Sequence, residues 1–283
     1  MRNDTLYVSD LDGTLLNGQS QLSEGTISSL NRLIQEEGAL FTVATARTPA
    51  TVTGIMEKVN TRLPFIVMAG AAYWDNAREQ YQKTRFISND LVTRLLECYG
   101  HHDIHPFIYR QHGNCIHAHH VAAMTDAERE FINHRLTSPL KQLFVQEKLS
   151  GQDEDGTMLV FSMGTYTALR AIADEIEQQS LPCTFMCYHD IFDHEQGYLE
   201  IYAAGTTKAQ AIQHMASQLG VERTVVFGDN LNDIPMMQEA SHSVAVGNAF
   251  EEVKNQADEI IGTNEEDAVV HWIERDVKTP VAR

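Results

Sequence analysis

Short apolar runs alternate with helix-like segments in the first third of the chain. The runs Leu6–Ser9, Leu40–Ala44 and Phe65–Met68 show no polar alternation, which predicts strands buried on both faces of a parallel sheet. Apolar residues recur at helical spacing after Ser23 and after Thr48-Pro49, and both positions are typical helix starts. Together these elements predict an α/β fold with a doubly wound parallel sheet.

This alternation stops in the middle of the chain. Tyr73-Trp74 and Gln80-Tyr81 flank the polar stretch Asp75–Glu79, and this pattern predicts a hairpin. After it, less regular strands mix with helices at 126–135 and 167–179. We therefore predict an inserted α/β domain over 83–190.

The α/β alternation returns near Tyr198 and continues almost to the end. The pattern predicts further core elements, namely strands at Leu199–Ala203, Thr224–Phe227 and Ser243–Val246 and helices at Thr207–Leu219 and Asp267–Arg275. We therefore predict that residues 1–82 and 191–283 form one core domain that the insertion divides.

Polar side chains follow the predicted core strands, and ligands of open α/β sheets bind at the carboxyl ends of the strands. Four carboxylates, one hydroxyl and two cationic groups are expected at this rim. They are Asp10 and Asp12 after the first strand, Thr45 and Arg47 after the second, Lys208 at the start of a later helix, and Asp229 and Asp233 in the segment GDNLND, which also contains Asn232.

These residue types point to phosphoryl transfer. Clustered carboxylates repel one another unless a cation lies between them, and all-oxygen ligands suit Mg²⁺. A carboxylate can attack phosphorus, and a second carboxylate two residues later can act as general acid and base. A lysine and a threonine hydroxyl can hold the transferred group.

The same segments resemble the motifs of the haloacid dehalogenase-like (HAD) superfamily. DLDGT at 10–14, Thr45, Lys208 and GDNLND at 228–233 are similar to its four motifs in order, and ATAR at 44–47, AGA at 69–71 and AVGNA at 245–249 resemble motifs of its Cof-type branch. The resemblance covers 1–82 and 191–283, and the insertion matches in length and position only. It implies a Rossmann-like core with an inserted α/β cap of type IIB that selects the substrate.

The resemblance also implies roles for the rim residues. Asp10 would be the nucleophile, Asp12 the general acid and base, and Thr45 and Lys208 the phosphoryl-binding pair. Asp10, the backbone carbonyl of Asp12 and Asp229 would bind Mg²⁺, Asp233 would support the metal or Lys208, and Asn232 would assist at the phosphoryl site. Ala46 and Ala69 stand where the branch has Gly and Asn, which affects specificity rather than chemistry.

The sequence allows two interpretations for each of three features: Arg47, the histidines and the cysteines. Arg47 either contacts substrate or pairs with a surface carboxylate. The histidines between 101 and 120 are solvated or core residues, or they form a metal or substrate site, because His117 and His119 would share a strand face. The four cysteines are buried free thiols, with a metal or redox pair at Cys183 and Cys187 as the alternative.

Composition narrows the function. There are 39 acidic and 21 basic residues, a net charge of −18 that disfavours binding to nucleic acid or to an anionic membrane. Nine basic and 14 acidic residues lie in 83–190, so the core carries −13. Substrate capture must then depend on local charge from Mg²⁺, Lys208 and Arg47. No signal peptide or transmembrane run is visible, which predicts a cytoplasmic protein.

We predict a Mg²⁺-dependent phosphatase that hydrolyses a small phosphorylated metabolite through an aspartyl-phosphate at Asp10. A phosphomutase similar to phosphomannomutases would share Asp10 and Asp12, and a catalytically silent binding protein would use the same acidic rim. The identity of the metabolite and the oligomeric state do not follow from the sequence.

Overall fold

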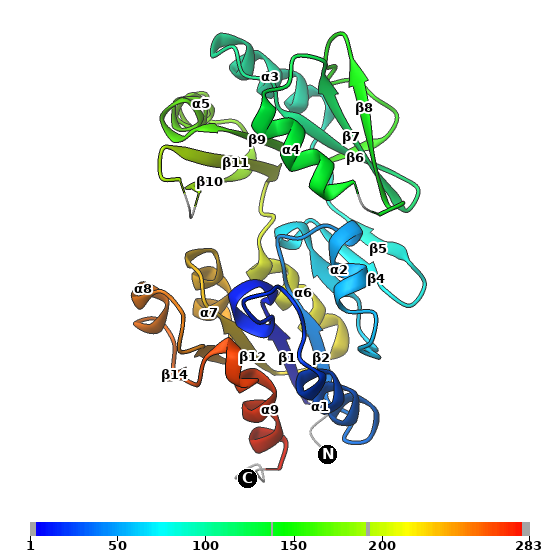
Figure 1. The fold of residues 1–283 in the computed structure, drawn as a ribbon, viewed down its shortest axis with the longest axis vertical. Helices are drawn as coiled ribbons and strands as arrows, with labels where there is room; N and C mark the ends of the chain where they lie inside the picture. The colour runs from blue at the N-terminus through cyan, green and yellow to red at the C-terminus, as the bar shows by residue number, and fades with distance from the viewer. Residues whose placement is uncertain (1–3, 137, 191–192, 279–283) are drawn as a thin grey trace. The chain divides into compact units, whose positions relative to one another are not determined.

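The computed structural model describes residues 4–136, 138–190 and 193–278, which form two compact units (Figure 1). The first unit contains the chain up to Lys83 and again from Thr207, and the second runs from Thr84 to Thr206. The first unit is therefore built from two segments that are far apart in sequence.

A parallel sheet lies at the centre of the first unit. Its strands are β1 (Thr5–Ser9), β2 (Leu40–Val43), β12 (Arg223–Gly228), β13 (His242–Ala245) and β14 (Glu259–Ile260), in the order β14-β13-β12-β1-β2. Every side chain of β1 is buried, as expected for a strand covered on both faces. The predicted α/β class is confirmed.

A smaller antiparallel sheet follows β2. It contains β3 (Phe65–Val67), β4 (Ala72–Asp75) and β5 (Gln80–Thr84) in that order, and a bridge between Ala44 and Ile66 joins β3 to the end of β2. The hairpin predicted around residues 73–81 is confirmed as β4 and β5.

The helices of the first unit begin and end close to the predicted signals. They are α1 (Glu24–Gln35), α2 (Pro49–Ile55), α6 (Lys208–Leu219), α7 (Ile234–Glu239), α8 (Glu251–Lys254) and α9 (Ala268–Lys278). The Ser23 hydroxyl caps α1 by accepting from the Thr26 amide. Helix α2 ends at Ile55, earlier than the apolar spacing predicted, and the apolar residues Met56 and Val59 of that spacing are buried beyond its end.

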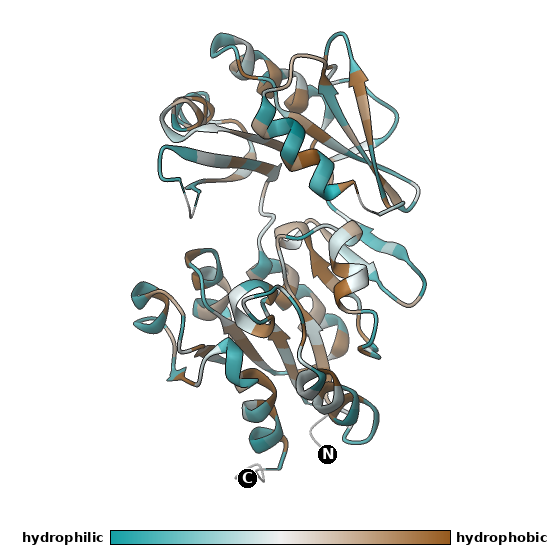
Figure 2. Ribbon diagram, in the orientation of Figure 1, coloured by the Kyte–Doolittle hydropathy of each residue, from teal (hydrophilic) through white to brown (hydrophobic). Residues whose placement is uncertain are grey.

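The second unit is built on a six-stranded sheet with helices on both faces. Helices α3 (Asn89–His101) and α5 (Tyr166–Gln178) pack on one face of this sheet. Helix α4 (Asp126–Arg135) covers the other face, where its Phe131 stacks on Phe161 of the sheet. Figure 2 shows α4 mostly in teal, as its many charged residues dictate. The strands, in the order β10-β11-β9-β6-β7-β8, are β6 (Phe107–His112), β7 (Cys115–Val121), β8 (Lys141–Gln146), β9 (Gly156–Thr165), β10 (Cys183–His189) and β11 (Gln196–Ala203).

The boundary of this unit differs from the predicted one. The sequence placed Leu199–Ala203 in the core and ended the insertion at residue 190, whereas this segment is β11, paired antiparallel with β9 and β10. An apolar strand has the same hydrophobic pattern in either sheet, so its partners cannot be read from its own residues. The second unit therefore extends to Thr206.

The four cysteines are free, and Cys98 is buried while the other three are half-buried. No helix in the described part of the chain is both long and apolar enough to cross a membrane.

Lys141 is a buried cation in the second unit. Lys141 is 4% exposed, and its Nζ donates to the Tyr109 hydroxyl at 2.7 Å. Burial and the nearby charge of Arg135 lower the pKa of Lys141 to about 7. The folded chain therefore holds this proton less tightly than the unfolded chain, and a stability penalty is fully present below pH 7 and disappears as the pH rises toward the unfolded pKa.

We expect the double variant Lys141→Met, Tyr109→Phe to be more stable than wild type at pH 7 by about 2 kcal/mol, because both partners of the buried pair become apolar. Urea unfolding at pH 7 and pH 9.5 measures this, and the gain should shrink at the higher pH. An equal difference at both pH values would contradict the assignment.

Candidate active site

The polar residues predicted at one rim of the sheet do lie at the ends of adjacent strands. Asp10 follows β1, Thr45 follows β2 and Asp229 follows β12, and β1 lies between the other two strands. The amide of Asp10 donates to the carbonyl of Phe227 at 3.0 Å, so the pairing of β1 with β12 continues up to the rim. Parallel strands thus bring together residues that are more than 200 positions apart.

Lys208 joins two of the carboxylates. Its Nζ donates to Oδ1 of Asp10 at 2.6 Å and to Oδ1 of Asp233 at 2.8 Å, and all three side chains are buried. Helix α6 begins at Lys208 because the Thr207 hydroxyl caps it by accepting from the Gln210 amide. The cap therefore fixes where the ammonium enters the site.

Hydrogen bonds hold the side chains of both Asp229 and Asp233. The Thr14 hydroxyl donates to Asp229 at 2.8 Å, and Oδ2 of Asp233 accepts from the amides of Asp229 and Asn230 at 3.1 and 3.2 Å. A Cβ on Gly228 would lie 2.7 Å from Cβ of Asp233, so glycine is required for this close approach.

The charges of this cluster are only partly compensated. Burial raises the pKa of Asp10, and Lys208 offsets this in part. Burial raises the pKa of Asp229 to about 6, with a further contribution from Asp233. Although burial disfavours the ammonium, Asp10 and Asp233 raise the pKa of Lys208.

These carboxylates fit a hard divalent cation. Oxygens of Asp10, Asp229 and Asp233 lie within 4.8 Å of one another, and a cation among them would relieve the repulsion that raises their pKa values. An all-oxygen donor set of this kind suits Mg²⁺.

Asp12 and Arg47 form a separate pair beside this cluster. Arg47 donates from Nε and Nη2 to the two carboxylate oxygens of Asp12 at 2.7 and 2.6 Å, and this pairing raises the pKa of Arg47. The residue after Asp12 is Gly13, whose φ of +75 and whose close approach to Asp229, 2.4 Å from where a Cβ would lie, both require glycine. The structure thus shows Arg47 paired with a carboxylate of the rim, and its contact with substrate stays a prediction.

Two predicted residues make other contacts. Thr45 is buried, and its hydroxyl accepts from the amide of Arg47 at 3.1 Å. Asn232 is exposed, in the short turn of 3-10 helix Leu231–Asp233.

Two positioning residues were not among the predicted site residues. Thr14 holds Asp229, and Asn248 donates from Nδ2 to the carbonyl of Gly13 at 2.7 Å, which ties the loop after β13 to the loop after β1. Both lie in segments whose resemblance was noted, DLDGT and AVGNA, so the motif itself was the available signal.

Ala69 occupies a left-handed backbone conformation, with φ 54 and ψ 24, and its amide donates to the carbonyl of Thr45. This conformation strains any residue with a Cβ, whereas Ala71 has ordinary helical angles. We expect Ala69→Gly to be more stable than the control Ala71→Gly by about 1 to 2 kcal/mol in urea unfolding. Equal stabilities of the two variants would show that Ala69 is not strained.

Comparison with known proteins gives full-length matches. Residues 7–273 match the family model described as haloacid dehalogenase-like hydrolase. The chain is 23% identical over 278 residues to the 5-amino-6-(5-phospho-D-ribitylamino)uracil phosphatase YitU of Bacillus subtilis, covering 95% of this chain and 96% of the relative. It is 24% identical over 275 residues to the HMP-PP phosphatase of Serratia proteamaculans, covering 96% and 94%.

A solved structure shares the fold. The HAD subclass IIB sugar phosphatase BT4131 superposes with a TM-score of 0.72 at 20% sequence identity, covering 96% of this chain and 98% of the other. The predicted architecture of a Rossmann-like core with an inserted domain is thereby confirmed as a fold.

Proposed function

The chain belongs to the haloacid dehalogenase-like hydrolases, as a phosphatase of the Cof-type branch, and from this premise we propose that it hydrolyses small phosphomonoesters through an aspartyl-phosphate at Asp10. The observation that carries the proposal is the buried contact of 2.6 Å between Asp10 and Lys208 at the end of β1. This contact supports the proposal because a carboxylate beside a fixed positive charge is suited to attack a phosphoryl group.

The reaction has two steps. In the first, an Oδ of Asp10 forms a bond to phosphorus while the bond from phosphorus to the ester oxygen breaks, and Asp12 gives its proton to the leaving alcohol. In the second, Asp12 takes a proton from water, the water oxygen bonds to phosphorus, and the Asp10–phosphorus bond breaks to release phosphate.

Arg47 supports the second step. Its paired hydrogen bonds orient the Asp12 carboxylate, the group that accepts a proton from water in this step. We infer that Asp12 leaves Arg47 to protonate the leaving group, which its half-exposed side chain permits.

Lys208 and Thr45 hold the phosphoryl group in this proposal, and Asn232 assists at the rim. Lys208 is already charged and fixed between two carboxylates, so little reorganisation is needed.

Mg²⁺ is the metal that we propose. Asp10, Asp229, the backbone carbonyl of Asp12 and, directly or through Lys208, Asp233 would hold it. When bound, it supplies positive charge that offsets the charge of the phosphoryl oxygens.

The substrate class is a small phosphorylated metabolite. The relatives are named for a phosphorylated ribitylaminouracil, for HMP-PP and for a sugar phosphate, so we infer a similar phosphometabolite here. We propose that the second unit, as the cap, selects among them. The cytoplasmic location expected from the sequence stays a prediction.

Phosphate release from a panel of phosphometabolites tests the function. We expect turnover with Mg²⁺ and loss of at least about 100-fold with EDTA, because the rim carboxylates repel a phosphate dianion without a cation. Zinc-free Mg²⁺ added in excess of EDTA should restore it.

The alternatives give different results. A phosphomutase would isomerise a sugar phosphate primed with the bisphosphorylated sugar and release little free phosphate. A silent binding protein would bind a metabolite and hydrolyse none of the panel. Phosphate binding that EDTA leaves unchanged would contradict the metal assignment.

A further inference from the structure

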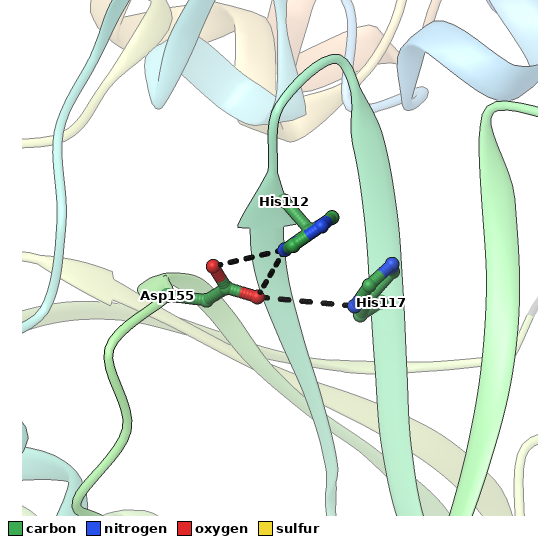
Figure 3. Close-up of side chains that lie close together, drawn as sticks. All are labelled: His112, His117 and Asp155. Atoms are coloured by element: carbon green, nitrogen blue, oxygen red, sulfur yellow. Dashed lines mark hydrogen bonds and ion pairs between the residues drawn. The ribbon is translucent and has the colours of Figure 1, made fainter.

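Three side chains of the second unit converge on one point. His112, His117 and Asp155 each direct a ligand atom toward the others, and these atoms lie within 4.8 Å of one another (Figure 3). His112 Nδ1 lies 3.0 Å from Oδ2 of Asp155, and His117 Nδ1 lies 3.8 Å from the same oxygen. We propose that these residues form a binding site for a divalent cation of the zinc class.

The strand register produces this convergence. His112 lies opposite Cys115 and Arg110 lies opposite His117, so the two histidines are diagonal neighbours on the β6–β7 hairpin. Their rings stack at 4.5 Å with an angle of 16°, which leaves both Nδ1 atoms facing the same carboxylate. The site thus comes from one hairpin and the loop beside it.

The loop that carries Asp155 is anchored by the buried side chain of Arg110. The buried Arg110 donates to Oδ2 of Asp153 and to the carbonyl of Ser150, both at 2.5 Å. The other oxygen of Asp153 accepts from the amide of Asp155 at 3.0 Å. A ligand held in this way requires little ordering when a cation binds.

The spacing suits tetrahedral coordination. Bonds of about 2.0 Å to a tetrahedral cation place neighbouring ligand atoms about 3.3 Å apart, close to the separations of 3.0 and 3.8 Å. Two imidazoles and one carboxylate are ligands that suit Zn²⁺ and similar divalent transition-metal ions, and water would fill the fourth position. Mg²⁺ prefers oxygen ligands, so this site and the carboxylate rim differ in the metal that they select.

The residues around the site add a further observation. His119, two residues along β7, has a buried Nε2 without a hydrogen-bond partner among the described residues. An unsatisfied polar atom beside the site is explained by a bound water or ion that completes the polar environment.

Cobalt binding tests the site. The full chain, stripped of metal and supplied with excess Mg²⁺ to occupy the carboxylate rim, is titrated with Co²⁺ while its visible absorption is recorded. We expect one Co²⁺ per chain with the intense bands of a tetrahedral site. His117→Ala, His112→Ala and Asp155→Asn should each weaken binding by at least about tenfold.

Two variants serve as controls. His134→Ala removes an exposed histidine of α4 and should bind Co²⁺ as wild type does. Asp229→Asn alters the carboxylate rim and should also keep the absorption bands. Loss of the bands in Asp229→Asn, or their retention in His117→Ala, would overturn the proposal.

Thermal unfolding gives an independent measurement that needs no substrate. With Mg²⁺ present, Zn²⁺ should raise the Tm of wild type and of His134→Ala but not of His117→Ala. An equal rise in all three proteins would place zinc elsewhere. Since neither measurement uses turnover, both remain decisive even if the proposed phosphatase reaction is wrong.

Discussion

Replacement of Asp10 by Asn is expected to lower kcat by about 10⁴-fold or more, because an amide oxygen cannot replace a carboxylate as the nucleophile. Asn has nearly the same shape, so the strand end and its contacts with the Phe227 carbonyl should persist. Phosphate release under saturating substrate measures the loss. A rapid-quench experiment with labelled substrate should find phosphorylated protein for wild type and none for the variant.

Asp126→Asn provides the matched control. Asp126 is fully exposed at the start of α4, so the same chemical change there should leave kcat unaltered. If Asp10→Asn turned over substrate at the wild-type rate, another residue would have to be the nucleophile. Labelled phosphate retained by the variant would have the same consequence.

Lys208→Met should reduce both activity and stability. Without the ammonium, Asp10 and Asp233 remain buried with no shared cation, which costs about 3 to 5 kcal/mol. The transferred phosphoryl group also loses a fixed positive charge, and we expect kcat to fall by about 10³-fold or more. Urea unfolding in EDTA and phosphate release in Mg²⁺ measure the two effects.

A second substitution separates the two effects. In Lys208→Met, Asp233→Asn one of the two carboxylates is neutral, so part of the stability should return while the activity stays low. Lys58→Met, which removes an exposed lysine paired with Glu24, should change neither quantity. A Lys208→Met protein as stable as wild type in EDTA would show that the buried pair is not ionised.

The carboxylate rim could be predicted because the carboxyl ends of neighbouring parallel strands lie at the same edge of the sheet. Once Leu6–Ser9 and Thr224–Phe227 are assigned as parallel strands, Asp10 and Asp229 must meet at the same edge, whatever the length of chain between them. The motif Gly228-Asp229 adds a glycine that permits the close approach of Asp233.

Other features depend on partners that the sequence does not name. The pairing of Arg47 with Asp12 depends on side-chain direction across two loops. The convergence of His112 with His117 depends on the register of the β6–β7 hairpin. A slip of one residue in one strand would turn its histidine to the opposite face of the sheet. The strand Gln196–Ala203 pairs in the sheet of the second unit. Its apolar side chains would suit either sheet, so its own residues do not reveal which one it joins.

The pairing of β1 with β12 constrains how the protein is made. Thr5 pairs with Arg223, so β1 leaves the ribosome long before its neighbour β12 is translated. At about 5 to 20 residues per second, this delay is on the order of 10 to 40 s. During that time β1 exposes an apolar edge with one partner, β2, while the whole second unit is synthesised. Completion of the carboxylate rim is therefore among the last events of biosynthesis, and a chain truncated before residue 223 cannot assemble it.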